Sequence, residues 1–518
     1  MTINLITFAS VLHKDANIRN SHEAIVNELE RYFSLNIIDY TQINNVDKNH
    51  LSVLFIATGG VEKLVAHCIE QLPRPTIMLA DGMQNSLAAA LEISSWLRSR
   101  GLKSEILHGE PDHIATRIMK LHKNFIAQQQ LSGVRIGVIG TPSSWLIASS
   151  VDYLLAKRRW GVEYIDVQLE RVYEKYNRIT DNEVGEACAQ FASRALACRE
   201  ASPEDLLKAM RLYRAIKEIC DEEKFSAITL SCFKLIEKTG TTGCLALSLL
   251  NDDGIIAGCE GDLQSIFTLI FLKKLTGKTG FMANPSLINA KENEIILAHC
   301  TVGTQLTEKF IIRSHFETEK GIGIQGILPS GDITVVKCGG ESLDEYFVAS
   351  GRLVENTNYI NMCRTQIRVK LDTDVSYFLK KLTGKTGFMA NPSLINAKEN
   401  ELILAHCTVG TQLTEKFIIR SHFETEKGIG IQGILPSGDI TVVKCGGESL
   451  DEYFVASGRL VENTNYINMC RTQIRVKLDT DMSYFLKNPL GNHHMVIQGN
   501  YVDEINEFLQ AYGCKQVN

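Results

Sequence analysis

The sequence predicts an α/β protein with two parallel-sheet domains and a β-rich, antiparallel barrel- or sandwich-like C-terminal domain that is partly duplicated. Three observations lead to this prediction. Apolar strand-like runs alternate with helical patterns up to residue 272. Short β-rich runs between Gly, Pro and Asp turns follow from residue 281. Residues 273–379 recur almost unchanged as residues 380–486. Strand–helix alternation is typical of parallel sheets, whereas closely spaced short strands indicate antiparallel structure.

The first domain is expected over residues 1–130. Buried apolar runs of four to eight residues predict strands, and apolar residues at helical spacing predict helices. Alternation of the two implies helices on both faces of a parallel sheet. The expected strands are 3–9, 51–57 and 75–79, and the expected helices are 21–32, 85–98 and 112–129.

The second domain is expected over residues 131–272 and opens with a strand at 134–139. The polar turn that follows contains Ser144 and Trp145 at the strand's carboxyl end, where open α/β sheets place ligands. We therefore expect both residues to bind substrate. A long helical region at 181–222 contains a helix start at Ser202, because Pro and two acids follow it. Strands at 227–230 and 254–257 and a helix at 263–275 complete the domain.

The C-terminal region contains a repeat with a period of 107 residues. Only two positions differ, Ile295 against Leu402 and Val375 against Met482. Natural repeats drift apart, so near-identity indicates a recent duplication, and a gene-assembly error remains an alternative. The expected domains are 273–379 and 380–486, followed by a tail at 487–518. Within the first copy, strands are expected at 295–298, 309–315, 333–337 and 366–370.

Composition restricts the function. The net charge of −6 argues against nucleic-acid and anionic-membrane partners, because both require a basic surface. No apolar run approaches the length of a membrane span, and the N-terminus lacks the pattern of a signal peptide. Fourteen cysteines include no Cys-x-x-Cys pair, which excludes the usual zinc and thioredoxin spacings. We expect a cytoplasmic protein with reduced thiols.

The densest group of candidate residues is the turn Gly258-Cys259-Glu260-Gly261-Asp262. Glu260 would emerge where a strand ends, and Asp262 where a helix begins. Asp262 is either a helix cap or a substrate-binding residue. His299 lies in an apolar strand and is either a core residue or a ligand. His493 and His494 are adjacent in a late strand, so at most one of them faces a given site.

In this order, the motifs resemble the L-fucose isomerase and L-arabinose isomerase superfamily, specifically its shorter fucose-isomerase-like members. The resemblance rests on Glu-Gly-Asp at 260–262, Phe-Met-Ala-Asn-Pro at 281–285, the strand with His299, and Gly-Asn-His-His at 491–494. The stretch from Arg135 to Ala148 is also similar to the start of the family's second domain. The resemblance implies two Rossmann- or flavodoxin-like domains before the β-rich domain, and a homo-oligomer.

The resemblance implies a metal-dependent aldose–ketose isomerase that acts on a monosaccharide through an ene-diol. A divalent cation, commonly Mn²⁺, would polarise the sugar oxygens, and a carboxylate would carry the proton. Glu260 matches a metal ligand and candidate base. His299 matches the strand histidine, and His494, more than His493, matches the C-terminal metal ligand.

Asn284 stands where the family pattern has a second carboxylate, at a position that is both catalytic and metal-binding. Its carbonyl oxygen can still bind a metal, but an amide cannot act as the base. The substitution leaves open a non-catalytic or regulatory sugar-binding protein on the same scaffold.

The repeat offers two candidates for each site residue between Glu260 and His494. Asn284 and His299 belong to the first copy, and Asn391 and His406 to the second. We favour the first copy, because an insertion just before the loop at 488–491 is better tolerated than one inside the helix after Glu260. The other copy is then an additional domain without a complete site.

Overall fold

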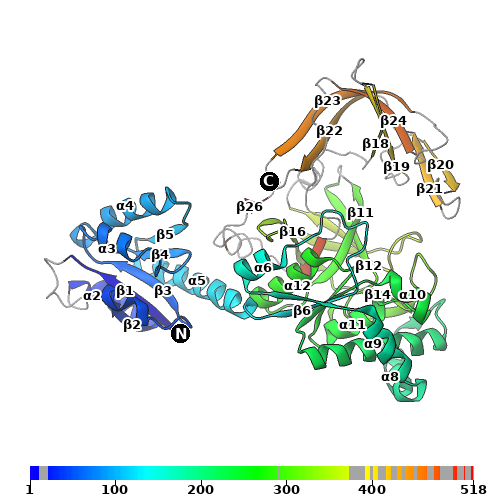
Figure 1. The fold of residues 1–518 in the computed structure, drawn as a ribbon, viewed down its shortest axis with the longest axis horizontal. Helices are drawn as coiled ribbons and strands as arrows, with labels where there is room; N and C mark the ends of the chain where they lie inside the picture. The colour runs from blue at the N-terminus through cyan, green and yellow to red at the C-terminus, as the bar shows by residue number, and fades with distance from the viewer. Residues whose placement is uncertain are drawn as a thin grey trace. The chain divides into compact units, whose positions relative to one another are not determined.

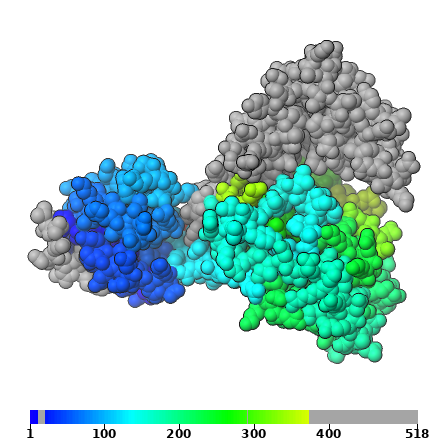
Figure 2. All heavy atoms as spheres, in the orientation of Figure 1, coloured from blue at the N-terminus to red at the C-terminus, as the bar shows by residue number. Residues whose placement is uncertain are grey.

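The structure is a computed structural model that describes residues 1–10, 21–289 and 292–372 in full (Figures 1 and 2). Beyond residue 372 it describes Glu507 and the backbone of strands between residues 391 and 516. The chain forms two compact units. One comprises Met1–Ser132, Lys274–Thr276 and Asp503–Lys515, and the other Gly133–Lys273, Gly277–Val502 and Gln516–Asn518.

The first unit is built on a parallel sheet of five strands. Ile3 and Leu5 pack into the core on one face, whereas Ile6 and Phe8 pack into the core on the other. Successive side chains of a strand point to opposite faces, so a strand that is apolar throughout is buried on both. The predicted parallel sheet is therefore confirmed. Its strand order is β2 (Ser34–Asp39), β1 (Thr2–Phe8), β3 (Leu51–Ile56), β4 (Thr76–Leu79) and β5 (Ser104–Leu107).

Helices cover both faces of this sheet (Figure 1). Val26 and Ile118 join the core that contains Ile3, and Ala90 and Ile93 join the opposite core. The three expected helices are present, with ends displaced by no more than two residues. The short helix α3 was not expected. The helical elements are α2 (Glu23–Tyr32), η2 (Tyr40–Asn45), α3 (Glu62–His67), η3 (Met83–Asn85), α4 (Ser86–Arg98) and α5 (Pro111–Leu131).

The second unit begins with a parallel sheet of four strands, in the order β10 (Ile256–Cys259), β9 (Ala227–Leu230), β6 (Arg135–Ile139) and β7 (Glu163–Val167). The strand expected at 254–257 starts two residues later, because Gly254 has a φ of 85° in the turn after α11. The accompanying helices include α6 (Tyr153–Trp160), α7 (Leu169–Arg178), α10 (Phe233–Thr239), α11 (Cys244–Asp252) and α12 (Leu263–Thr276).

The helical region expected at 181–222 is interrupted. It consists of α8 (Asp181–Arg194) and α9 (Pro203–Glu223), and α9 begins at the predicted Ser202 cap. Between them, β8 (Ala197–Cys198) pairs with β13 (Lys309–Arg313), which also pairs with β14 (Gly323–Ile327). The interruption depends on a partner more than 100 residues away, so the local helical pattern could not indicate it.

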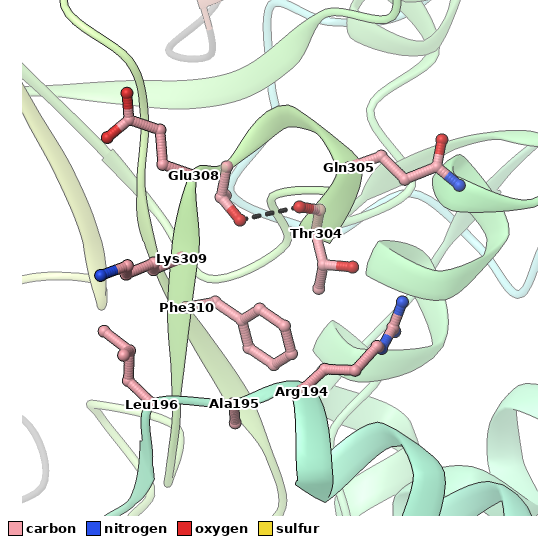
Figure 3. Close-up of a pocket in the computed structure, with 9 residues that line it drawn as sticks. Arg194, Ala195, Leu196, Thr304, Gln305, Glu308, Lys309 and Phe310 are labelled. Atoms are coloured by element: carbon pink, nitrogen blue, oxygen red, sulfur yellow. Dashed lines mark hydrogen bonds between the residues drawn. The ribbon is translucent and has the colours of Figure 1, made fainter.

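A polar groove opens where the end of α8 meets β13 (Figure 3). Its volume is about 380 Å³, and its charged residues Arg194, Glu308 and Lys309 have mixed sign. None of the candidate site residues lines it. The other lining residues are Ala195, Leu196, Thr304, Gln305, Thr307 and Phe310.

The sheet of the C-terminal region has seven strands, and six of them form an antiparallel ring that closes on itself, so the predicted antiparallel, barrel-like region is confirmed. The seventh strand is β26 (Lys515–Gln516). β25 completes the closure because it pairs with β11 on one side and with β15 on the other. Order around the barrel is β15 (Gly331–Gly339), β25 (His494–Gln498), β11 (Phe281–Asn289), β12 (Glu294–His299), β17 (Thr365–Leu371) and β16 (Glu345–Asn356), which pairs again with β15.

The second copy repeats this strand order with one difference. Its sheet runs β18-β19-β24-β23-β22, and within the described residues no strand lies between β18 and β22, where β25 would correspond. The chain has two nearly identical sets of strands but only one β25 segment. In the structure, β25 pairs with strands of the first copy. The strands are β18 (Asn391–Asn396), β19 (Glu401–His406), β24 (Thr472–Leu478), β23 (Glu452–Asn463) and β22 (Gly438–Gly446), with β20 (Lys416–Ser421) paired to β21 (Ile429–Ile434).

No helix within the described residues is long and apolar enough to cross a membrane.

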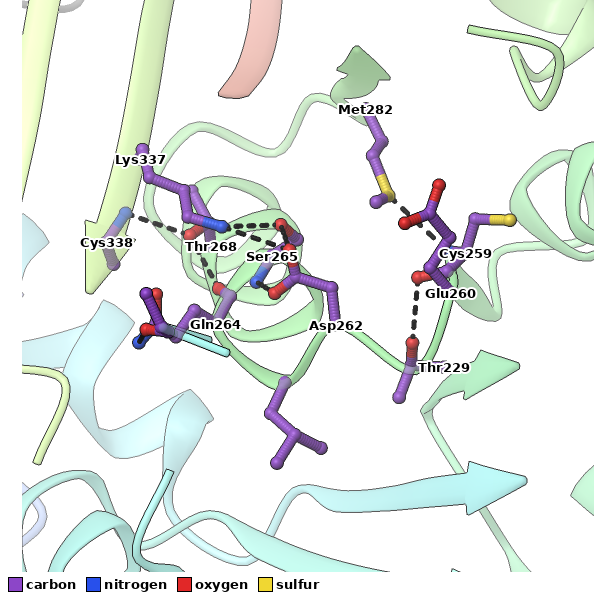
Figure 4. Close-up of polar contacts among 12 residues, drawn as sticks. Thr229, Cys259, Glu260, Asp262, Gln264, Ser265, Thr268, Met282, Lys337 and Cys338 are labelled. Carbon is purple, nitrogen blue, oxygen red and sulfur yellow. Dashed lines mark hydrogen bonds and ion pairs between the residues drawn. The ribbon is translucent and has the colours of Figure 1, made fainter. Parts of the chain in front are cut away.

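A buried ion pair joins α12 to the barrel (Figure 4). Asp262 caps α12 through the backbone N–H of Ser265 at 2.8 Å, and its other oxygen lies 3.2 Å from Nζ of Lys337 on β15. Neither Asp262 nor Lys337 has any exposed side-chain surface. Burial lowers the pKa of Lys337, and the Asp262 carboxylate opposes that shift. The structure thus shows Asp262 as a helix cap and ion-pair partner.

The substitution Lys337→Met is expected to lower the free energy of unfolding of the second unit by about 3–5 kcal/mol, because it leaves a buried carboxylate unpaired. Urea denaturation followed by tryptophan fluorescence measures this change. Lys444→Met alters the corresponding lysine of the second copy, for which the repeat provides no counterpart of Asp262, and is the matched control. Equal losses of stability from the two substitutions would contradict the role of the Asp262–Lys337 ion pair.

Candidate functional site

Glu260 occupies a strained turn at the end of β10. Its φ is 63°, and the next residue, Gly261, has a φ of 70°. Left-handed backbone is unfavourable for a residue with a side chain and tends to persist at functional sites. A Cβ at Gly261 would lie 2.7 Å from Cα of Pro142, so only glycine fits there. The backbone N–H of Ser143 donates to the Glu260 carbonyl at 2.9 Å and fixes the turn.

The Glu260 carboxylate is oriented by an aromatic side chain. Nε1 of Trp145 donates to Oε2 of Glu260 at 2.8 Å, and the Trp145 ring packs edge-on against Phe233 at 5.4 Å. Trp145 is half exposed, so the site is open to solvent on this side. Ser144 and Trp145 of the polar turn were predicted to bind substrate. Trp145 contacts Glu260 directly. Ser144 is exposed, and its neighbour Ser143 makes the backbone contact.

Strand register brings three further candidates together. On β11, Ala283 pairs with His494 of β25, and Asn284 pairs with Ala298, which precedes His299 on β12. The backbone therefore places Asn284 beside both histidine-bearing strands. Oδ1 of Asn284 is buried and has no hydrogen-bond partner within the described part of the chain. An unpaired buried carbonyl is unfavourable without a partner, and none comes from the part of the chain that the structure describes.

Glu260, Asn284 and His299 line one cavity of about 100 Å³. His299 is 4% exposed, and its Nδ1 lies 2.9 Å from Oγ1 of Thr301. This contact fixes the orientation of the imidazole ring at the cavity wall. These three residues lie within 39 positions of one another in the sequence and come from three different elements. The fold brings them to one cavity.

Several candidates lie elsewhere or outside the described side chains. Asp262 points away from Glu260 toward Lys337 (Figure 4) and does not line the cavity, so its expected substrate-binding role has no support in these contacts. For His494 only the backbone is described, and His493 lies outside the described residues. The backbone of Asn391 lies on β18 and that of His406 on β19, but their side chains are not described.

The sequence interpretation missed His315 and Glu317, which lie between β13 and β14 and line the same cavity. Burial raises the pKa of Glu317; nearby His315 opposes the rise, and the Glu260 carboxylate adds to it. Glu317 is thus a second carboxylate close to Glu260. It lies in the polar loop His-Phe-Glu-Thr-Glu-Lys, where no local pattern separates a site residue from an ordinary surface acid.

The remaining lining residues are aromatic, apolar or thiol-bearing. They include two phenylalanines and five cysteines from distant segments. These residues are Phe233, Phe316, Ile236, Thr242, Cys232, Cys244, Cys259, Cys300 and Cys363.

The donor set fits a divalent cation only in part. The Glu260 carboxylate and the unpaired Oδ1 of Asn284 are oxygen donors of the kind that Mn²⁺ and Mg²⁺ prefer. Within the described ranges, no group of three or more His, Cys, Asp or Glu side chains is arranged to hold a metal ion. A complete shell would need at least one further ligand.

Comparison with known proteins identifies similar sugar isomerases, and no family model matches the chain. The chain is 22% identical over 265 residues to sulfoquinovose isomerase of Alkalicoccus urumqiensis, covering 49% of this chain and 59% of that protein. It is 26% identical over 223 residues to sulfoquinovose isomerase of Clostridium sp. (strain MSTE9), covering 42% and 49%.

A third relative, sulfoquinovose isomerase of Priestia aryabhattai, is 22% identical over 224 residues, which is 42% of this chain and 50% of the relative. The chain therefore spans about half the length of the curated relatives that it matches. Over that portion, it is similar to proteins that isomerise a sugar.

Proposed function

We propose that this protein is an aldose–ketose isomerase that acts on a monosaccharide through an ene-diol. One observation carries the proposal: the strained Glu260 turn directs a carboxylate, held by Trp145, into a cavity that also contains the unpaired Oδ1 of Asn284. The similarity to sulfoquinovose isomerases over about half the chain supports the same class of reaction.

Isomerisation requires a proton to move from C2 of the aldose to C1. In our proposal, the Glu260 carboxylate removes the C2 proton, which leaves an ene-diolate with a C1–C2 double bond and the negative charge on O1. The same carboxyl group then returns the proton to C1 while the O2 proton moves to O1, and the product is a ketose. A positioned carboxylate can serve as acid and base in turn. Trp145 holds it in one orientation through a 2.8 Å hydrogen bond.

Asn284 positions the sugar in this scheme. Its buried Oδ1, which has no partner among the described residues, can accept a hydrogen bond from a sugar hydroxyl. Glu317 lies close enough to Glu260 for the two carboxylates to affect each other's charge. Aromatic side chains at Trp145, Phe233 and Phe316 offer the flat apolar surface against which a sugar ring packs.

We further propose that a divalent cation, most simply Mn²⁺, binds at Glu260 and Asn284, with His494 and His299 as additional ligands. When bound, such a cation polarises the sugar carbonyl and stabilises the negative charge of the ene-diolate. This part of the proposal rests on the two oxygen donors at the cavity, the Glu260 carboxylate and Oδ1 of Asn284.

We assign the site to the first copy of the repeat. Glu260 and Asn284 line one cavity, and β25 pairs with β11 and β15 of the first copy. The second copy contributes an additional β domain, whose described strands have no counterpart of β25.

Glu260→Gln is expected to lower aldose–ketose exchange at least about 100-fold, because an amide cannot carry the proton. The assay follows ketose formation by NMR with neutral and sulfonated monosaccharides as substrates, and calorimetry measures sugar binding by the same preparations.

Metal analysis before and after dialysis against a chelator tests whether the protein binds a divalent cation. Glu308→Gln, in the separate polar groove, is the control. A wild-type protein that binds sugar without converting it would favour the sugar-binding alternative.

Asn284→Ala is expected to reduce kcat/KM at least about tenfold, since one lost hydrogen bond or ligand is worth about 1.4 kcal/mol or more. The identical substitution in the second copy, Asn391→Ala, is expected to have a much smaller effect. Steady-state kinetics of the two variants decides which copy forms the site. The reverse result would assign the site to the second copy.

A further inference from the structure

The cavity that contains Glu260 is lined by five cysteines. Cys300 interacts with both Cys244 and Cys363, and the remaining two, Cys232 and Cys259, contact each other. Sγ of Cys232 and Sγ of Cys259 are 2.9 Å apart, closer than the van der Waals contact of two sulfur atoms. Each residue is 5% exposed, and both line the cavity. The pair is therefore shielded from large reagents, yet a small solute that enters the cavity can reach it.

The fold holds these two cysteines together through neighbouring strands. β9 and β10 run parallel, and their last residues, Leu230 and Cys259, are paired in register. Cys232 follows two residues after β9, and its sulfur also lies 3.4 Å from the Leu230 carbonyl. A Cβ at Gly243 would lie 3.0 Å from this sulfur, so close packing leaves it little room to turn away.

We propose that Cys232 and Cys259 form a redox-sensitive thiol pair that hydrogen peroxide converts to a disulfide. One thiol is oxidised by peroxide to a sulfenic acid with release of water. The second thiol displaces that hydroxyl group, so that an S–S bond forms and a second water leaves. Overall, two thiols lose two hydrogen atoms and one peroxide is reduced to two waters. A disulfide has an S–S bond of about 2 Å, so the two sulfurs need to approach by roughly an ångström.

The modification would act on the site because Cys259 directly precedes Glu260. Glu260 and Gly261 have left-handed backbone and are confined by Pro142 and Ser143, so the turn has little freedom to absorb a shift of its neighbour. Drawing Cys259 toward Cys232 changes the position of the Glu260 carboxylate relative to Asn284. This consequence for activity rests on the proposed function, whereas the disulfide itself does not.

The first test maps the disulfide in the full-length protein. The reduced protein is treated with hydrogen peroxide, free thiols are blocked with iodoacetamide, and non-reducing digests are analysed by mass spectrometry. We expect a cross-link between the peptides of Cys232 and Cys259 that dithiothreitol removes. Cys232→Ser should abolish this cross-link. Cys198→Ser, which replaces an exposed thiol outside the cavity, should leave it intact.

A different pairing, such as Cys244 with Cys300, or irreversible oxidation without a cross-link, would overturn the assignment. So would formation of the cross-link only after denaturation, since the native contact would then play no part.

The second test measures isomerase activity of the same samples before oxidation, after it and after reduction. We expect oxidation to lower the wild-type rate at least about tenfold and dithiothreitol to restore it, whereas Cys232→Ser keeps a ratio of oxidised to reduced activity near one. If the cross-link forms and the rate of isomerisation does not change, the proposed effect of the disulfide on the Glu260 site is wrong. If no isomerase activity exists at all, the proposed function fails, and the mapping experiment still decides the thiol pair independently.

Discussion

The buried pair of Asp262 and Lys337 is the contact on which the second unit depends. It joins the first turn of α12 to strand β15, so it fixes the parallel-sheet part of this unit to the barrel. Two charges removed from water are tolerated only where their hydrogen-bonding capacity is satisfied. Here Ser265 donates to both carboxylate oxygens, and Lys337 also donates to Oγ of Ser265 at 2.7 Å. The geometry of the Glu260 turn follows, because Asp262 is only two residues away.

Neighbouring residues in this turn have opposite roles. Glu260 faces the cavity, and Asp262 faces the barrel (Figure 4). The left-handed backbone of Glu260 and Gly261 makes this reversal of direction. Its conformational cost is offset by the backbone contact with Ser143 and by the cap on α12. The carboxylate that faces the cavity is thus held by the same short segment that anchors α12 to the barrel.

The repeat presents a different constraint, because the chain has two nearly identical sets of strands and only one β25. Local sequence cannot favour either set, since the residues that pair with β25 in the first copy recur in the second. The first copy follows Asp262 and α12 directly in the chain, whereas the second copy is separated from them by the whole first copy. Pairing of β25 with β11 therefore completes the barrel that is already attached to the Glu260 turn.

The sequence by itself determined the strand–helix alternation, the two parallel sheets, the antiparallel C-terminal region and the Ser202 cap, and it made the turn at Glu260 a candidate site. Each of these depends on local periodicity or on residues a few positions apart. Only the tertiary structure decided that Asp262 pairs with Lys337, that β8 interrupts the helical region, and that Glu317 and five cysteines share a cavity with Glu260. These contacts join residues from separate segments of the chain, and one sequence carries no local signal of which distant side chains meet.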